Sequence, residues 1–289
     1  MQYIGDIYRP PSEANSLIIQ VTVGCARNSC TFCSMYKAKK FYVREMDDIL
    51  SDLEEMSVKY GKFVDRIFLA DGNALIIPAK DMVFLLTEIK RLFPQCRRIS
   101  SYGAPKDVLE KTPEELKAIY EAGLELVYMG LESGDETVLK QVKKGVTAEE
   151  IVQAGIKLRQ SGMKLSLTII SGLGSKERLQ QHAEQSALAM NRINPEYASL
   201  LTLMVEPGTP LYKQVQSGEF ELLSATDVMD ELLVFLENCN SEGTVFRSNH
   251  ASNYLALAGT FNGDIDRLIE EVLQAKQSLR FRPEGYRRL

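Results

Sequence analysis

Three cysteines within nine residues are the part of this 289-residue chain best suited to chemistry: Cys25, Cys30 and Cys33. Thiolates at such short spacing bind soft metals, so the loop predicts either a zinc site or an iron-sulfur cluster. A structural zinc site normally takes four protein ligands from two paired segments. The chain has no second Cys-x-x-Cys pair and no histidine pair, which disfavours zinc.

Two kinds of iron-sulfur cluster remain open for the spacing Cys-x4-Cys-x2-Cys. Plant-type [2Fe-2S] ferredoxins use this spacing and add one distant cysteine, which here would be Cys96 or Cys239. Both lie alone in apolar or helical surroundings, where a cysteine is more often a small buried hydrophobic residue. The other kind is a [4Fe-4S] cluster held by three cysteines, in which one iron stays open to a further ligand.

The cysteine loop must be positioned by the strand before it, a β-branched run at residues 16–23 that ends at Gly24. From there, strand and helix patterns alternate along the chain. One helix has a complete amino-terminal signal, in which Thr112 is the cap, Pro113 follows and Glu115 completes a capping box. The strands are predicted at 16–23, 65–70, 97–102, 124–131, 163–170 and 197–205, and the helices at 46–56, 81–93, 112–123, 135–143, 148–161 and 179–193.

Six repeats of strand and helix predict an α/β fold, because a helix that crosses over between two strands makes those strands parallel. The repeats fit a barrel or an open α/β sheet. We expect a partial (β/α)6 TIM-like barrel over residues 1–210. From residue 211 to 289 the pattern becomes mainly helical, which predicts a C-terminal extension that closes the barrel mouth.

The composition limits the kinds of partner. The net charge is -5 and basic residues are interspersed with acidic ones, so stable nucleic-acid binding is not expected. No apolar run approaches about 18 residues, and the first residues lack the pattern of a signal peptide, so no membrane partner is expected. Clustered cysteines fit a reducing compartment, and we therefore expect a cytoplasmic protein.

Polar and glycine-containing segments follow most of the predicted strands. Besides the cysteines, these segments are residues 71–73, 130–134, 171–174 and 206–210. Each alone is typical of an ordinary turn. Because the carboxyl ends of parallel strands in a barrel meet on one rim, where ligands bind, we expect these segments to form one site together with the cysteines.

The strand ends and the cysteine loop, with Phe32 directly before its last cysteine, resemble the radical S-adenosylmethionine (SAM) superfamily over about residues 16–210. The branch that they resemble includes oxygen-independent coproporphyrinogen oxidase and the tRNA methylthiotransferases. The usual spacing there is Cys-x3-Cys-x2-Cys, so this loop has one extra residue between Cys25 and Cys30. The resemblance implies a [4Fe-4S] cluster bound by Cys25, Cys30 and Cys33, which are also the expected catalytic residues.

The resemblance also implies which residues bind SAM. Asp71-Gly72-Asn73 is similar to the Gly-Gly-Glu motif that receives the methionine ammonium, although it keeps only one glycine. Glu132 and Thr168 are similar to residues at the SAM ribose, and Arg159 is similar to an arginine that pairs with the SAM carboxylate. Arg159 equally fits an ordinary solvated helix charge. The expected set is Phe32, Asp71, Gly72, Asn73, Tyr102, Glu132, Ser133, Arg159, Thr168 and Ser171.

By this resemblance the protein would take one electron from a flavodoxin or ferredoxin and split SAM into methionine and a 5'-deoxyadenosyl radical, which removes hydrogen from a substrate. Residues 246–254 are dense in hydrogen-bonding side chains, which fits a substrate site, a solvated turn or a helix cap. The expected substrate contacts are Tyr36, Glu206, Arg247, Asn249, His250 and Asn253. The other histidine, His182, lies on a polar helical face and is predicted to be solvated.

A small-molecule substrate is expected, because the chain shows neither extra cysteine pairs for an auxiliary cluster nor the small RNA-binding domain usual in methylthiotransferases. One fitting chemistry is C-C or C-N bond cleavage by a lyase, as in enzymes that cut the modified nucleobase queuine. A tetrapyrrole decarboxylase or oxidoreductase is the alternative enzyme. A ferredoxin-like electron-transfer protein is the alternative from a different class.

The cysteine assignments predict how iron content responds to substitution. Protein reconstituted without oxygen should hold about four irons and four sulfides per chain. Cys25→Ala, Cys30→Ala or Cys33→Ala should abolish cluster binding in an iron and sulfide assay, because each removes a thiolate ligand. Cys96→Ala and Cys239→Ala are the controls and should keep the cluster. Loss of the cluster in either control would support a ferredoxin-type site instead.

Overall fold

The computed structural model describes residues 1–288, and the chain divides into two compact units. The first unit comprises Met1–Asn28, Met35–Met129 and Lys157–Leu165. The second comprises Ser29–Ser34, Gly130–Ile156 and the chain from Ser166 onward. The chain passes between units inside the cysteine loop, so Cys25 belongs to the first unit, whereas Cys30 and Cys33 belong to the second.

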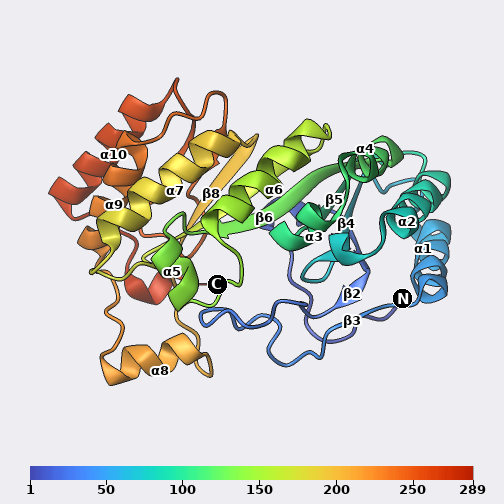
Figure 1. The fold of residues 1–289 in the computed structure, drawn as a ribbon, viewed down its shortest axis with the longest axis horizontal. Helices are drawn as coiled ribbons and strands as arrows, with labels where there is room; N and C mark the ends of the chain where they lie inside the picture. Colours follow the sequence, from blue (N-terminus) through green and yellow to red (C-terminus); the bar gives the residue numbers. More distant parts are fainter. Residues whose placement is uncertain (289) are drawn as a thin grey trace. The chain divides into compact units, whose positions relative to one another are not determined.

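The first unit is a parallel sheet with helices beside it (Figure 1). Its strands lie in the order β1 (Leu17–Gln20), β4 (Arg66–Ala70), β5 (Arg98–Tyr102) and β6 (Leu124–Glu132), and the last three residues of β6 belong to the second unit. Helices α1 (Met46–Tyr60), α2 (Ala79–Leu92) and α4 (Pro113–Ala122) lie side by side. Two short strands pair antiparallel, namely β2 (Thr22–Val23) and β3 (Tyr42–Val43). The remaining elements are α3 (Pro105–Glu110) and the 3-10 turns Pro11–Glu13 and Ala74–Ile76.

Burial explains why these segments form strands. The four residues from Ile67 to Ala70 in β4 are fully buried, as expected for a parallel strand that is covered on both faces. The rings of Phe68, Tyr102 and Tyr128 meet edge to face with centroids 5.1 to 6.1 Å apart, and they fill one side of the sheet. The capping box predicted at Thr112 is present and begins α4.

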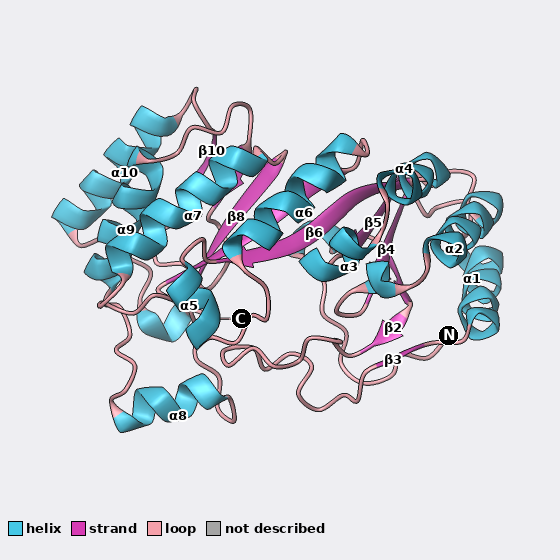
Figure 2. Cartoon of the chain, viewed as in Figure 1, coloured by secondary structure: helices cyan, strands magenta, loops and turns pink. Residues whose placement is uncertain are grey.

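The second unit continues the α/β pattern (Figure 2). Strands β7 (Lys164–Ser171), β8 (Tyr197–Thr202) and β9 (Val245–Arg247) pair in parallel, and β10 (Ala258–Thr260) pairs antiparallel with β9. Helix α9 (Ala225–Glu237) packs against both α7 (Leu179–Ile193) and α10 (Ile265–Ser278). Helix α8 (Pro210–Ser217) stands apart from these three helices. The remaining elements are α5 (Glu136–Gln141), α6 (Ala148–Gln160), whose last turn belongs to the first unit, and the 3-10 turn Glu284–Tyr286.

The predicted α/β class with mostly parallel strands is confirmed. The first predicted strand is divided at Val21, because β2 leaves the parallel sheet and pairs with β3. The C-terminal part contains the predicted helices and also β9 and β10, which are only three residues long each and so leave no clear sequence pattern. The domain boundary at residue 210 remains a prediction. Within residues 1–288, no helix has the length and apolar character needed to cross a bilayer.

Candidate functional site

In the first unit, the start of the cysteine loop is held by Asp71, the first residue after β4. The Asp71 Oδ2 atom accepts hydrogen bonds from Gly24 N at 3.1 Å, Gln20 Nε2 at 3.1 Å and Lys39 Nζ at 2.7 Å. Asp71 is fully buried, and its Oδ1 atom has no hydrogen-bond partner among the described residues. The buried carboxylate therefore fixes the backbone at Gly24, where the cysteine loop begins, and Lys39 balances its charge.

Gly72 lets the loop backbone lie directly against the end of β4. Gly72 N donates to Gly24 O at 3.1 Å. A Cβ atom at Gly72 would lie 2.7 Å from the Cβ of Cys25 and 2.8 Å from Gly24 O, which is closer than real atoms approach. Any larger residue at this position would therefore push Cys25 away. This cradle fits a loop whose cysteine must hold a fixed place as a metal ligand.

Asn73 joins the loop to a carboxylate that the sequence analysis did not single out. Asn73 Oδ1 accepts from Ala26 N at 3.4 Å, and Asn73 Nδ2 donates to Asp107 Oδ2 at 2.6 Å. Asp107 lies in α3 and is 2% exposed, and burial raises the pKa of its carboxyl above the ordinary value. Its other oxygen, Oδ1, lies 3.9 Å from Arg27 Nη2. We call Arg27, Asn73 and Asp107 the Asp107 cluster.

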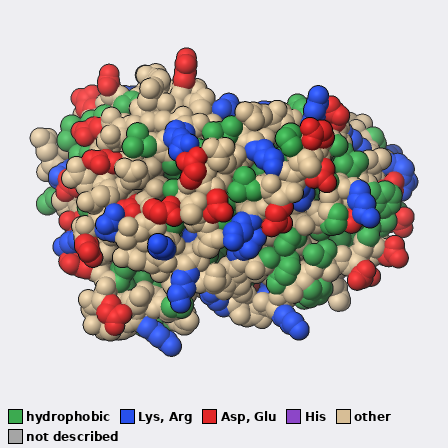
Figure 3. Space-filling model, viewed as in Figure 1, with side chains coloured by type: hydrophobic (Ala, Val, Ile, Leu, Met, Phe, Trp, Pro, Cys, Tyr) green, Lys and Arg blue, Asp and Glu red, His purple; other side chains and the backbone are tan. Residues whose placement is uncertain are grey.

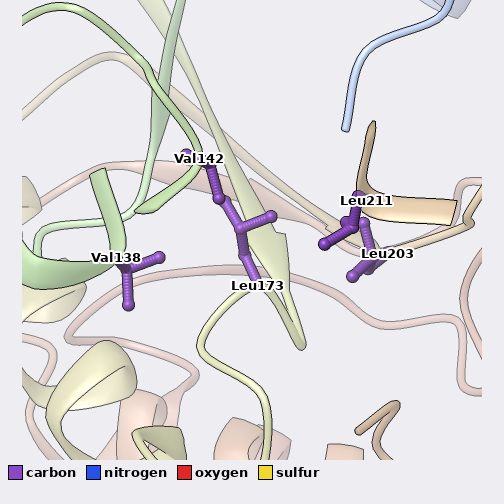
Figure 4. Close-up of a cluster of buried hydrophobic side chains, with 5 residues drawn as sticks. All are labelled: Val138, Val142, Leu173, Leu203 and Leu211. Atoms are coloured by element: carbon purple, nitrogen blue, oxygen red, sulfur yellow. The ribbon is translucent and has the colours of Figure 1, made fainter. Parts of the chain in front are cut away.

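In the second unit, the rest of the cysteine loop is held by backbone hydrogen bonds and by one aromatic ring. Thr31 N donates to Val142 O at 2.9 Å, and Leu211 N donates to Thr31 O at 3.0 Å. Phe32 packs against a buried apolar cluster in which Val142 lies next to Leu173 and Leu203 lies next to Leu211 (Figure 4). Phe32, predicted to bind the cofactor, is thus also an apolar anchor between Cys30 and Cys33.

Glu132, at the end of β6, has a strained backbone. Its φ is +61°, a left-handed conformation that costs a non-glycine residue about 1 to 2 kcal/mol. Its carboxylate accepts a hydrogen bond from Lys144 Nζ at 2.9 Å, and the two side chains are only 14% and 13% exposed. Strain of this kind is typical of functional positions, which agrees with the predicted role of Glu132 at the SAM ribose.

The prediction that His182 is solvated is wrong, because His182 is 1% exposed. Its Nε2 atom lies 3.1 Å from Ile170 O and its Nδ1 atom lies 2.7 Å from Ser133 Oγ. A carbonyl can only accept, so Nε2 carries the proton and, in the neutral ring, Ser133 donates to Nδ1. Gln180 and Gln181 made the segment look polar, but His182 lies on the side of α7 that also buries Ala183, Ser186 and Met190.

Glu231 of α9 reaches the turn after β7. It is 2% exposed, and its Oε1 accepts from Gly172 N at 2.8 Å and lies 3.9 Å from His182 Nε2. Gly172 has a φ of +85°, which favours glycine. Burial raises the Glu231 pKa, and neither its Oε2 nor the neighbouring Ser171 Oγ makes a hydrogen bond of normal geometry. Buried groups thus fix the backbone at two predicted SAM segments, 132–134 and 171–172.

Several other predicted cofactor residues occupy defined places. Thr168 and Ser171 lie on β7, where Thr168 is half-buried and Ser171 is buried. Tyr102, at the end of β5, packs on Phe68, and burial raises the pKa of its hydroxyl. Arg159 is half-buried in the last turn of α6. The expected roles of these four residues in cofactor binding stay predictions.

Two arginines near the C-terminus hold the backbone of the predicted substrate segment, residues 246–254. Arg282 Nη1 donates to the carbonyl oxygens of His250, Ala251 and Asn253 at 3.0, 2.8 and 3.0 Å. Arg287 Nε donates to Ser252 O at 2.6 Å, and its guanidinium lies over the Tyr254 ring at 4.0 Å. The backbone of residues 250–254 is therefore fixed by two arginines.

Among the predicted substrate contacts, Asn253 is fully engaged inside the protein. Its Oδ1 accepts from Thr202 N at 2.6 Å, and its Nδ2 donates to Leu200 O at 2.7 Å and Ser248 Oγ at 3.0 Å. Asn249 and Arg247 are exposed, and Arg247 Nη1 donates to its neighbour Phe246 O at 2.7 Å. Glu206 is half-buried.

The half-buried His250 is held by its neighbour Ser252. Ser252 N donates to His250 Nδ1 at 3.1 Å, so Nδ1 is an acceptor and the proton of the neutral ring lies on Nε2. In the first unit, Tyr36 is 5% exposed and meets Tyr8 edge to face at 5.5 Å. Because Arg247 and Asn249 are exposed and His250 is half-buried, these three side chains of the segment are accessible to a ligand.

The thiols divide into two chemical groups. Cys25, Cys30 and Cys33 are each half-buried, which suits ligands that must meet an incoming metal. Burial raises the pKa of Cys96 to about 11 and raises that of Cys239 too, and both thiols donate to backbone carbonyls. Cys96 also precedes β5, at the opposite end of the parallel strands from Cys25, which argues against it as a fourth ligand. Within residues 1–288, no three His, Cys, Asp or Glu side chains are gathered as a metal site.

Comparisons with known proteins support the family that the cysteine loop predicts. A family profile described as the Radical SAM superfamily matches residues 19–185, which is more than half of the chain. The chain is 22% identical to the heme chaperone HemW of Bacillus subtilis (strain 168) over 201 residues, 67% of this chain and 52% of HemW. It is 25% identical to the ribosomal protein uS12 methylthiotransferase RimO of Caldanaerobacter subterraneus subsp. tengcongensis over 209 residues, 67% of this chain and 44% of RimO. The chain spans about half the length of these curated relatives.

Among solved structures, coproporphyrinogen III oxidase (HemN) from Escherichia coli, described as a radical SAM enzyme, is similar to this chain with a TM-score of 0.57. The identity is 18%, and the match covers 77% of this chain and 52% of HemN. At this identity the likeness concerns the fold alone. It confirms the predicted class, an α/β fold of the partial TIM-like barrel type.

Glu231→Gln tests whether the buried carboxyl is neutral in the folded protein. Because burial raises its pKa above 4.5, the folded state keeps a proton that the unfolded state releases. The stability contributed by this group is complete below about pH 4.5 and is lost as the pH rises through the raised pKa. In urea unfolding between about pH 5 and pH 8, the wild type should lose stability relative to Glu231→Gln. Glu237→Gln, exposed on the same helix, should follow the wild type, and equal slopes in all three proteins would show that Glu231 is ionised.

His250 offers a direct measurement, since the chain has only two histidines. Burial lowers the pKa of His250 below 6.5, and the Arg282 guanidinium lowers it further. Arg282→Ala should raise the His250 pKa toward 6.5, because it removes a neighbouring cation and loosens the loop; histidine NMR titration measures this. Arg280→Ala, also in the C-terminal segment, is the control and should leave the pKa unchanged. An unchanged His250 pKa in Arg282→Ala would contradict this account of the loop.

Proposed function

The chain belongs to the radical SAM superfamily, and we propose on this premise that it is an enzyme that removes hydrogen from a small-molecule substrate. The cofactors of this family are a [4Fe-4S] cluster and SAM. The observation that carries the proposal is the firm anchoring of the cysteine loop: by Asp71 and Gly72 at its start, and by Phe32 farther along. Such anchoring fits thiolates that must hold a cluster in place.

The chain's own residues have separate tasks in this proposal. Cys25, Cys30 and Cys33 hold the cluster, which together with SAM supplies one-electron cleavage of a sulfur-carbon bond. Gly72 keeps the backbone of Cys25 in place, and Phe32 packs the segment between the other two cysteines against the apolar cluster. Glu132 has a strained backbone, and its carboxylate is already paired with Lys144, so this carboxylate is oriented to accept a hydrogen bond from a ribose hydroxyl.

The remaining cofactor contacts follow from the family resemblance and from the positions of the residues. We assign Thr168 and Ser171 on β7, with Tyr102 and Ser133, to the nucleoside, and Arg159 to the methionine carboxylate. Ser133 is supported by the contact between its hydroxyl and His182, which gives that hydroxyl one defined direction. Asp71 and Asn73 support the site indirectly, because their side chains are buried and make hydrogen bonds to the backbone of the cysteine loop.

A small molecule suits the surface better than a nucleic acid does. On the face drawn in Figure 3, basic and acidic side chains are interspersed, without the continuous basic stripe that a phosphate backbone favours. We assign the substrate contacts to Arg247, Asn249 and His250, on the backbone that Arg282 fixes, and to Tyr36 and Glu206. Asn253 contributes by holding this segment rather than by direct contact.

For the reaction, we propose cleavage of a C-C or C-N bond by a lyase that acts on a small molecule such as a modified nucleobase. A second candidate is the oxidation or decarboxylation of a tetrapyrrole, because the cysteine loop and the strand ends resemble the branch that includes oxygen-independent coproporphyrinogen oxidase. The electron would come from a flavodoxin or ferredoxin, and the cytoplasm is the proposed location.

The proposal is tested by SAM cleavage in the absence of any substrate. Anaerobically reconstituted protein with dithionite or reduced flavodoxin should convert SAM to methionine and 5'-deoxyadenosine, both measured by chromatography, since this step needs only cluster, cofactor and electron. Cys33→Ala should abolish it, whereas Cys239→Ala, the matched control, should keep it. A protein with about four irons per chain that leaves SAM intact would overturn the proposed function.

A further inference from the structure

Two side chains close the cysteine loop across its two ends. Asn28 Nδ2 donates to Tyr36 O at 2.6 Å, and Lys37 Nζ donates to Asn28 O at 2.7 Å. All three residues belong to the first unit, whereas the segment between them, Ser29–Ser34, belongs to the second. The two bonds therefore join the places where the chain leaves the first unit and returns to it. We call Asn28, Tyr36 and Lys37 the loop clamp.

The acceptor of the loop clamp, Tyr36, has a fixed place in the first unit. It is 5% exposed, and its carbonyl oxygen also accepts from Lys39 N at 3.1 Å, which closes a turn. Lys39 Nζ donates to Asp71 Oδ2 at 2.7 Å, the same buried oxygen that accepts from Gly24 N. One buried carboxylate therefore ties both ends of the cysteine loop, its start at Gly24 and its end at Tyr36.

The donor, Asn28, also stands on a fixed backbone. It is half-buried in a turn, and the two residues before it have partners of their own. Ala26 N donates to Asn73 Oδ1 at 3.4 Å, and Arg27 belongs to the Asp107 cluster. The Asn28 amide therefore reaches the opposite carbonyl from a backbone that is already ordered, which limits the entropy lost in making the bond.

Asn28 lies in the part of the loop that has one residue more than the usual spacing. Four residues separate Cys25 from Cys30, and Asn28 is the third of them. Cys30 lies two residues after Asn28, and Cys33 lies three residues before Tyr36. These two cysteines are thus joined by short lengths of chain to the two sides of the loop clamp. Because three thiolates must meet one cluster, a backbone ordered beforehand lowers the entropy lost on binding.

We propose that Asn28 is a positioning residue for the cluster, because its amide closes the cysteine loop and so holds Cys30 and Cys33 in place to bind iron. Lys37 supports the same closure, but its bond is exposed and contributes less. Neither side chain needs to touch the cluster, since the effect passes through the backbone. The inference rests on the proposed function, which supplies the cluster.

The rate at which the cluster loses iron tests this role. Anaerobically reconstituted wild type, Asn28→Ala, Lys37→Met and Lys40→Met are mixed with an excess of the chelator ferrozine, without SAM, and iron release is followed by absorbance. Asn28→Ala should release iron about tenfold faster, because losing a partner outside the ligand shell typically weakens metal binding by at least that factor. Lys37→Met should release it about twofold faster. Lys40, exposed in the same segment, is the control, and Lys40→Met should match wild type.

Thr112→Ala separates positioning of the loop from general stability. Thr112 caps α4, far from the cysteine loop in sequence, so removing its hydroxyl destabilises the folded protein without touching the loop. Thr112→Ala should release iron at the wild-type rate. The inference is overturned if Thr112→Ala releases iron as fast as Asn28→Ala, or if Asn28→Ala releases it no faster than wild type.

Hydrogen exchange of the cluster-free protein gives a second readout. In Asn28→Ala, the amides of residues 25–39 should exchange faster than in wild type, whereas those of α9 should exchange at the same rate. Unchanged exchange at residues 25–39 would show that the loop is equally ordered without the loop clamp, which also overturns the inference. If wild type takes up no iron, the proposed function fails instead, and hydrogen exchange still tests the loop clamp.

Discussion

The contact between the end of β4 and the start of the cysteine loop is the constraint on which the candidate site in the first unit depends. Gly24 and Asp71 are 47 residues apart in the chain, yet the Asp71 carboxylate accepts from the Gly24 amide. Gly72 has no side chain, and the backbone of Cys25 fills the space that one would take. Leaving the Asp71 carboxylate unpaired inside the protein would cost several kcal/mol, so this arrangement specifies one position for the loop.

In the second unit, a different kind of interaction fixes the rest of the cysteine loop. Phe32 packs against an apolar cluster, so that part of the loop is held by the hydrophobic effect instead of by charge. The turns after β6 and β7 are fixed by buried polar groups, with His182 at Ser133 and Glu231 at Gly172. These groups lie on α7 and α9, far from the strand ends in sequence. Helices α7 and α9, which carry none of the predicted cofactor residues, thereby set the geometry of two predicted cofactor segments.

The C-terminal part of the chain has a comparable supporting role. Arg282 and Arg287 donate to four carbonyl groups of residues 250–253, which holds this segment without using its side chains. Asn249 and His250 can then present their side chains from a fixed backbone, which lowers the entropy lost on binding. The segment follows β9, which extends the sheet next to β8.

The sequence alone determined the class of the protein and its chemical centre, because both are local signals. Alternating strand and helix patterns predict an α/β fold from short stretches, and three thiols within nine residues predict an iron-sulfur loop. Tertiary structure decided the rest, because burial depends on contacts between distant segments. The two glutamines before His182 predict a solvated side chain, yet His182 lies on the buried face of α7 and contacts Ser133. Likewise, no residue near Asp107 in the sequence predicts its hydrogen bond with Asn73. Such pairings depend on how strands and helices pack, and no spacing along the chain records them.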